Sequence, residues 1–99
     1  MKNSFEEFKN LIMQKKYYKA HEVLEEIWHP MRKSLHPERD IIRGFINAAV
    51  SLELKKRGRN NYLKVWNTYE KHKIKVKNNK LYSDLVIFLD NYKKGNICK

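Results

Sequence analysis

Residues 41–57 read IIRGFINAAVSLELKKR, and this stretch decides the fold. Its apolar side chains recur at spacings of three and four residues and cover most of a helical circumference, which is typical of a helix that other helices surround. We expect this helix to begin at Pro37, since proline suits the first helical position, and to end at Gly58. A stripe of small residues would let a neighbouring helix approach closely: Gly44, Ala48 and Ser51.

Two helices are predicted before this one. The first covers residues 5–15, with Ser4 and Glu7 forming a capping box at its start. The second covers residues 17–29 and ends there because Pro30 disfavours helical geometry in the residue before it.

Two more helices are predicted after it. The first follows a cap at Asn60 or Asn61 and ends between residues 72 and 77. Asn78 and Asn79 form a turn, Ser83 caps the last helix, and that helix ends before Gly95. Short connections make sequential helices antiparallel neighbours, so residues 1–99 predict one all-α domain, a compact bundle of about five helices.

The cysteine count and the length of the apolar runs narrow the expected cellular compartment. The single cysteine, Cys98, allows no disulfide within a monomer, which fits the reducing cytoplasm. No apolar run approaches the roughly 20 residues of a membrane span, and the N-terminal residues do not resemble a signal peptide. We therefore expect a cytoplasmic protein with no membrane partner.

Charge is distributed unevenly in this chain of formal net charge +11. Residues 55–80 contain ten Lys and Arg against the single acid Glu70, whereas residues 1–54 contain nine basic and eight acidic side chains. A basic segment of this kind is typical of a surface for nucleic acid or another polyanion. The candidate contacts are Lys55, Lys56, Arg57, Arg59 and Lys64. The excess of seventeen Lys over five Arg, with ten Asn, also fits a compositional bias, so both interpretations stay open.

A second candidate site follows from YYKAHEVLEEIW at residues 17–28, where His21, Glu25 and Trp28 are spaced i, i+4 and i+7 on one side of a helix. If this helix packs on residues 37–57, their polar partners are Arg43, Asn47 and Glu53. One interpretation is a hydrogen-bonded brace between the helices. The other is a small polar pocket with an aromatic wall, in which the His–Glu pair serves as an oriented general base.

Metal and cofactor chemistry is not expected. The stretch His21-Glu22-x-x-Glu25 lacks the second histidine of the zinc-protease pattern. Glu26-x-x-His29 matches one half of a di-iron carboxylate site, but no second half is present. We predict no metal, no cofactor and no catalytic residue.

The same stretch resembles the small helical family catalogued as domain of unknown function 309, with the pattern F-x-A-H-E-x-L-E-x-x-W and a following G-L-I-Q-x-A-x-A helix. The resemblance covers roughly residues 10–70. Asn47 stands where the family tends to have Gln, Arg43 replaces a Gln, and Glu53 falls where His is common. It implies an all-α bundle and a polar signature, and it implies no activity. The matching residues are Ala20, His21, Glu22, Leu24, Glu25, Trp28, Gly44, Phe45, Ile46, Ala49 and Leu52.

Together these observations favour a non-catalytic helical module that binds a partner, either a polyanion such as nucleic acid or a protein. The alternative is a small-ligand binder or enzyme that uses His21, Glu25 and Trp28. A third prediction is a homo-oligomer whose interface uses exposed aromatic residues such as Tyr17, Tyr18 or Tyr62.

Overall fold

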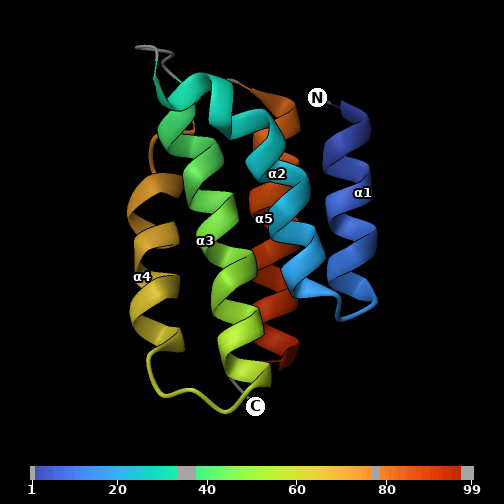
Figure 1. The fold of residues 1–99 in the computed structure, drawn as a ribbon, viewed down its shortest axis with the longest axis vertical. Coiled ribbons are helices and arrows are strands. Elements are labelled where there is room, and N and C mark those ends of the chain that lie inside the picture. The colour runs from blue at the N-terminus through green and yellow to red at the C-terminus, as the bar shows by residue number, and fades with distance from the viewer. Residues whose placement is uncertain (1, 34–37, 77–78, 97–99) are drawn as a thin grey trace.

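The computed structural model describes residues 2–33, 38–76 and 79–96, and five helices lie in those ranges (Figure 1). No strand occurs in them, so the predicted all-α bundle is confirmed. None of the described helices is both long and apolar enough to cross a membrane. The helices are α1 (Lys2–Met13), α2 (Tyr17–Arg32), α3 (Arg39–Lys56), α4 (Tyr62–Lys73) and α5 (Lys80–Asn96).

Helix α3 runs through the middle of the bundle, with α2 on one side of it and α4 on the other (Figure 1). Helices adjacent in sequence run antiparallel, and α1 and α5 close the remaining sides. The bundle measures 36 × 24 × 24 Å. Its lower end in Figure 1 therefore holds the α1–α2 turn, the end of α3 and the start of α4, while its upper end holds the end of α4 and the start of α5.

Aromatic rings from four helices meet in the core around Phe45 of α3. Its ring centroid lies 6.1 Å from that of Phe5 in α1 and 6.2 Å from that of Tyr69 in α4. The ring of Tyr82 in α5 lies 6.0 Å away. All four rings are almost completely buried, so this cluster removes a large apolar area from water and holds α1, α4 and α5 against α3.

The polar ends of the buried aromatic residues find hydrogen-bond partners. The Tyr82 hydroxyl donates to Glu38 at 2.5 Å, and the Tyr69 hydroxyl donates to Asp90 of α5 at 3.1 Å. The Trp66 indole donates to Glu70 at 2.8 Å. Burial raises the pKa of the Tyr69 hydroxyl, and the Asp90 carboxylate raises it further, so the phenol stays neutral.

Helix α4 is fastened to α3 at both ends through the predicted stripe of small residues. At the lower end, the hydroxyl of the fully buried Ser51 donates to the Tyr62 carbonyl at 2.6 Å. At the upper end, Gly44 faces His72 so closely that a Cβ placed on Gly44 would lie 2.6 Å from the His72 Cβ. The prediction that small residues admit a close neighbour therefore holds for these two positions.

Three predicted helix boundaries before α3 are wrong. Helix α1 ends at Met13 and not at Lys15. Ser4 is the third residue of α1, which begins at Lys2, so Ser4 does not cap the helix. Helix α2 continues through Pro30 to Arg32. Proline removes one backbone hydrogen bond, but Met31 reaches the core and is 9% exposed, so burial favours the extra turn.

The predicted end of α3 and start of α4 agree with the structure, whereas both predicted ends of α5 are wrong. Helix α3 ends at Lys56, and Gly58 follows with φ +73, as expected for a helix-terminating glycine. Asn61 occupies the N-cap position of α4, although its side chain makes no capping bond. Ser83 does not cap α5, because Asn79 takes that role and its Oδ1 accepts the Tyr82 backbone N–H at 3.2 Å. The last helix continues through Gly95.

The expectation that Tyr17 is an exposed interface residue is also wrong. Its side chain is 5% exposed, and its hydroxyl is bonded to that of Tyr92 in α5 at 2.5 Å. Tyr18 is exposed and Tyr62 is half-buried. The predictions for Pro37, Asn78 and Cys98 lie outside the described residues.

The close contact at Gly44 gives the first testable prediction. Alanine is the better helix former by about 1 kcal/mol, but Gly44→Ala forces apart two Cβ atoms that are fixed to their backbones. We expect a net loss of about 1–2 kcal/mol in the free energy of unfolding. Gly95→Ala, at a helical glycine with no atom within 4 Å of the added Cβ, serves as the control and should give no loss. Equal effects in urea titrations of the two variants would contradict the close contact.

His72 gives a pH prediction. Burial lowers its pKa, and repulsion from Lys75 and Arg43 outweighs the attraction of Asp40. The unfolded chain, with an ordinary His pKa of 6.5, then binds more protons than the folded chain as the pH falls below 7. We expect the free energy of unfolding to fall between pH 7.5 and 5.5 more steeply in the wild type than in His72→Gln. Parallel curves for the two proteins would contradict this assignment.

Candidate functional site

Helix α2 presents the signature residues beside its buried face. Ala20 and Leu24 are fully buried, and the next residues along the helix, His21 and Glu25, lie at the border of the core. The His21 side chain is 13% exposed. Its Nδ1 lies 2.6 Å from the Tyr18 carbonyl oxygen, which can only accept, so Nδ1 is the donor. The imidazole ring is therefore held in one orientation by its own helix.

Glu25 lies between two histidines. Its Oε1 is 2.9 Å from Nε2 of His21, and its Oε2 is 3.7 Å from Nε2 of His29. Because Nδ1 of His21 already donates, Nε2 can donate to the carboxylate only when the ring carries both protons. The His21–Glu25 contact is therefore an ion pair only when the ring is protonated, and its two partners are neighbours on one helix.

A hollow of about 260 Å³ between α2 and α3 brings five of the predicted cluster residues together. Asn47 does not reach across this hollow, because its Nδ2 donates to the Arg43 carbonyl of its own helix at 2.9 Å. Ile46 and Val50 supply the apolar part of the wall. The signature residues that line it are His21, Glu25, Trp28, Arg43 and Asn47.

Glu53, the sixth residue of the predicted cluster, does not join that hollow. Its side chain is 16% exposed, and its Oε2 accepts from Nε of Arg57 at 2.5 Å. This ion pair explains how the structure accommodates a carboxylate on an apolar helix face. Glu53 instead lines a second hollow of about 250 Å³, which shares His21 and Val50 with the first.

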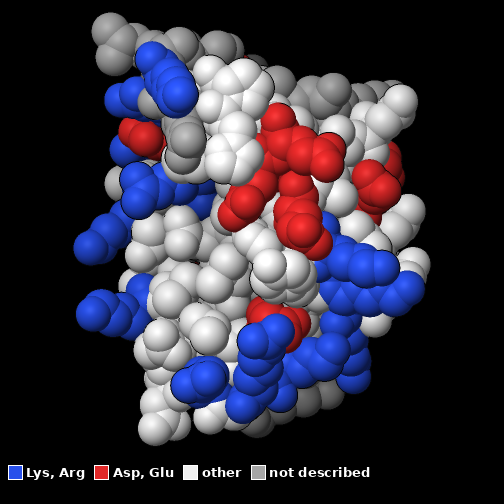
Figure 2. All heavy atoms as spheres, in the orientation of Figure 1, with Lys and Arg blue, Asp and Glu red and all other residues white. Residues whose placement is uncertain are grey.

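Basic side chains gather at the lower end of the bundle, and we call this group the basic end. All of these side chains are exposed. In the described part of the chain, one of them, Arg57, forms an ion pair with a carboxylate, that of Glu53. Figure 2 shows blue side chains around the lower end, below the red side chains that lie over α2. The members are Lys15, Lys16, Lys19, Lys55, Lys56, Arg57, Arg59 and Lys64.

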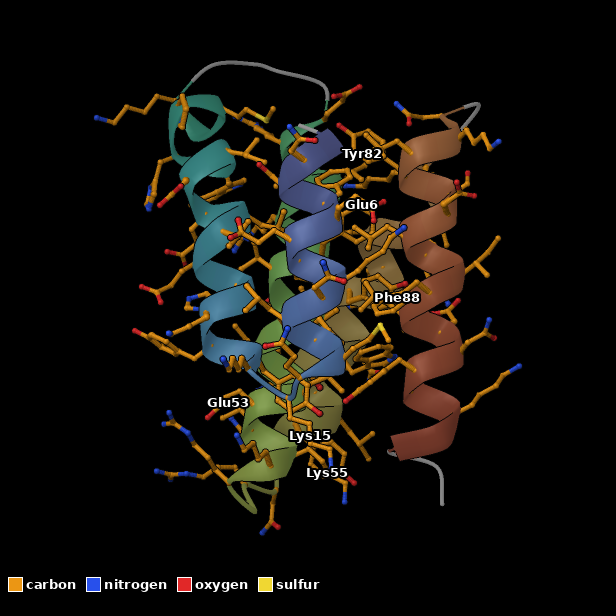
Figure 3. The ribbon with its side chains drawn as sticks, turned by 90° about the vertical axis from the view of Figure 1, so that its right-hand side faces the viewer. Glu6, Lys15, Glu53, Lys55, Tyr82 and Phe88 are labelled. Carbon is orange, nitrogen blue, oxygen red and sulfur yellow. The ribbon has the colours of Figure 1, made fainter. Side chains whose placement is uncertain are left out.

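The structure places three further lysines beside the predicted basic residues, and the sequence analysis did not include them: Lys15, Lys16 and Lys19. Nζ of Lys56 donates to the Lys15 carbonyl at 3.1 Å and so ties the end of α3 to the α1–α2 turn. Figure 3 shows Lys15 and Lys55 at this same end, with Glu53 nearby. One signal was available in the sequence: the turn after the first helix carries Lys15 and Lys16 in succession.

Aromatic rings accompany the cations of the basic end. Nζ of Lys55 lies 5.3 Å from the centre of the Tyr62 ring, and Nζ of Lys56 lies 5.9 Å from that of Tyr17. Such contacts hold a cation in place without neutralising its charge. These lysines therefore remain available to an anion from solution.

Metal coordination finds no support in the described residues, where no group of three or more His, Cys, Asp or Glu side chains could hold an ion. The Ser51 hydroxyl is not available as a nucleophile, because it is buried and donates a hydrogen bond to the Tyr62 carbonyl. The arrangement offers a small hollow lined by the His21–Glu25 contact and a separate cationic surface.

The comparison with known proteins identifies one family. The family model described as "Domain of unknown function (DUF309)" matches residues 5–68, which include the signature of α2 and the whole of α3. No curated protein and no solved structure matches the chain.

The His21–Glu25 pair gives a stability prediction. Glu25→Gln removes the carboxylate that faces the His21 ring, but this carboxylate is partly exposed to water. We expect the free energy of unfolding to fall by less than about 1 kcal/mol at low salt. Glu22→Gln, an exposed acid on the same helix, is the matched control and should leave stability unchanged. A loss much larger than 1 kcal/mol would show that the pair is a main brace of the fold.

Proposed function

This chain belongs to the domain of unknown function DUF309 family, and we propose that it is a non-catalytic module that binds a polyanion, RNA or DNA, at its basic end. The proposal places the protein in the cytoplasm, where nucleic acid is abundant, and its single cysteine is consistent with a reducing compartment.

The observation that carries the proposal is the position of the cations relative to the helix ends. Cations stabilise the C-terminal end of a helix and destabilise its N-terminal end. The helix dipole thus accounts for Lys55 and Lys56 in the last turn of α3. It does not account for Lys19 in the first turn of α2 or Lys64 in the first turn of α4, and neither turn contains an acidic residue.

Lys19 and Lys64 are therefore present at a cost to local stability, which suits residues kept for binding. They flank the cations of the α1–α2 turn and the α3–α4 loop, and with the end of α3 the basic end presents positive charge from five segments of the chain. A phosphate backbone with regularly spaced charges is the natural partner of such a surface.

The signature hollow is the weaker candidate. His21 and Glu25 are already bonded to each other, and Asn47 is bonded to its own helix, so few polar groups there point at a ligand. The basic end has eight exposed cations and one carboxylate partner among the described residues. The charge balance favours the basic end as the binding surface.

The double variant Lys19→Glu with Lys64→Glu tests the proposal. Acids in these first turns complement the helix dipole, so we expect each substitution to raise stability by about 0.3–1 kcal/mol. Oligonucleotide binding should weaken, and the slope of log affinity against log salt should decrease by roughly 1.5 because two phosphate contacts are lost. Fluorescence anisotropy with a labelled oligonucleotide measures the affinity.

The control carries the same change in net charge at the upper end of the bundle. Lys71→Glu with Lys80→Glu replaces two exposed lysines, one at the end of α4 and one at the start of α5 (Figure 1). We expect this control to bind nearly as well as the wild type at moderate salt. Equal weakening of both double variants would mean that net charge alone drives binding, and no binding by the wild type would leave a protein as the partner.

A further inference from the structure

A hollow at the edge of the basic end has the size and lining for a flat aromatic ligand. It measures about 250 Å³, which is below the range typical of drug-sized ligands and suits a single ring system. Val50 and Leu54 of α3 form an apolar wall, Tyr18 of α2 stands at the rim, and Arg57 joins the hollow to the basic end. The remaining lining residues are His21 and Glu53.

Tyr18 is an aromatic residue held in an exposed position. Its side chain is 55% exposed, and it is the one aromatic among the large exposed hydrophobic residues of the described part of the chain. The His21 ring packs against it at an angle of 62° with ring centroids 4.8 Å apart, while Nδ1 of His21 holds the Tyr18 carbonyl. The Tyr18 ring is thus positioned before any ligand arrives, which lowers the entropy cost of stacking on it.

The charged side chains in and around the hollow favour different parts of a ligand. The Glu53 carboxylate lines the hollow as an ion pair with Arg57, so the two charges offset each other and a neutral group fits the interior. The exposed cations Arg59 and Lys19 lie in segments adjoining the hollow and attract phosphates there. A neutral ring inside and a phosphate outside is the arrangement that a nucleotide provides.

We propose that the hollow beside Tyr18 receives an unpaired nucleobase, so that the basic end selects single-stranded nucleic acid over a duplex. This proposal rests on the proposed function of the basic end. A base inside a duplex is stacked on its neighbours and cannot enter the hollow, whereas a base in a single strand can stack on Tyr18. Stacking tolerates every base, so selection acts on strandedness and not on sequence.

The experiment compares four ligands at one salt concentration by fluorescence anisotropy and competition: a labelled 12-nucleotide single strand, the corresponding duplex, inorganic polyphosphate and a free mononucleotide. We expect the single strand to bind roughly 5- to 100-fold more tightly than the duplex. The mononucleotide should bind weakly, because it brings few phosphates to the cations. Binding of the mononucleotide as tight as that of the single strand would identify a free nucleotide as the ligand and overturn the proposal.

Variants of Tyr18 complete the test. Tyr18→Ala should weaken binding of the single strand roughly 5-fold or more and leave the duplex and polyphosphate unchanged, whereas Tyr18→Phe should bind like the wild type. Ile87→Ala, at an exposed residue of α5, is the control. Because Tyr18 is exposed, circular dichroism should show every variant folded.

The outcomes separate this inference from the proposed function. If Tyr18→Ala binds the single strand as the wild type does, or if single strand and duplex bind equally, the base-binding role of the hollow is overturned while the polyanion surface stands. If the wild type binds none of the polyanions at low salt, both proposals are overturned.

Discussion

The close approach of α3 and α4 at Gly44 and His72 is the constraint on which the rest of the structure depends. A glycine at this crossing lets the His72 Cβ approach the α3 backbone, and the Ser51 bond to the Tyr62 carbonyl fixes the other end of α4. With α4 held in this way, Phe45 can reach the rings of α1, α4 and α5 at once. A larger residue at position 44 would separate the helices and open that cluster, since packed interiors tolerate little added volume.

The same arrangement creates the candidate binding surface. Because sequential helices run antiparallel, the α1–α2 turn and the α3–α4 loop lie at one end of the bundle, and both segments are basic. The hydrogen bond from Lys56 to the Lys15 carbonyl holds the end of α3 beside the α1–α2 turn. The hollow beside Tyr18 borders this surface through Arg57, so charge attraction and aromatic stacking are available to one ligand. The family signature supports this geometry indirectly, because His21 orients both the ring and the carbonyl of Tyr18.

Local features and the close approach of a neighbouring helix at Gly44 and Ser51 were predictable from the sequence, whereas most partners contributed by other helices were not. The i, i+4 spacing of His21 and Glu25 predicts their contact because one helix holds both. The apolar run of residues 41–54 predicts a buried α3, and Gly58 predicts its end. Pro30 misled the prediction because the burial of Met31 outweighs one lost backbone bond. The partners of Tyr17, Lys15 and Glu38 come from residues at least 41 positions away in the chain, and only the docking of whole helices brings them together.

The central claim is that the lower end of the bundle is the binding surface, and an NMR titration tests it most directly. Amide spectra of the ¹⁵N-labelled protein would be recorded while a single-stranded oligonucleotide is added at low salt. The account predicts that shifts concentrate in residues 15–19 and 53–64 and are absent from residues 71–76 and 80–86 at the upper end. Shifts centred on the upper end, or none anywhere, would contradict it.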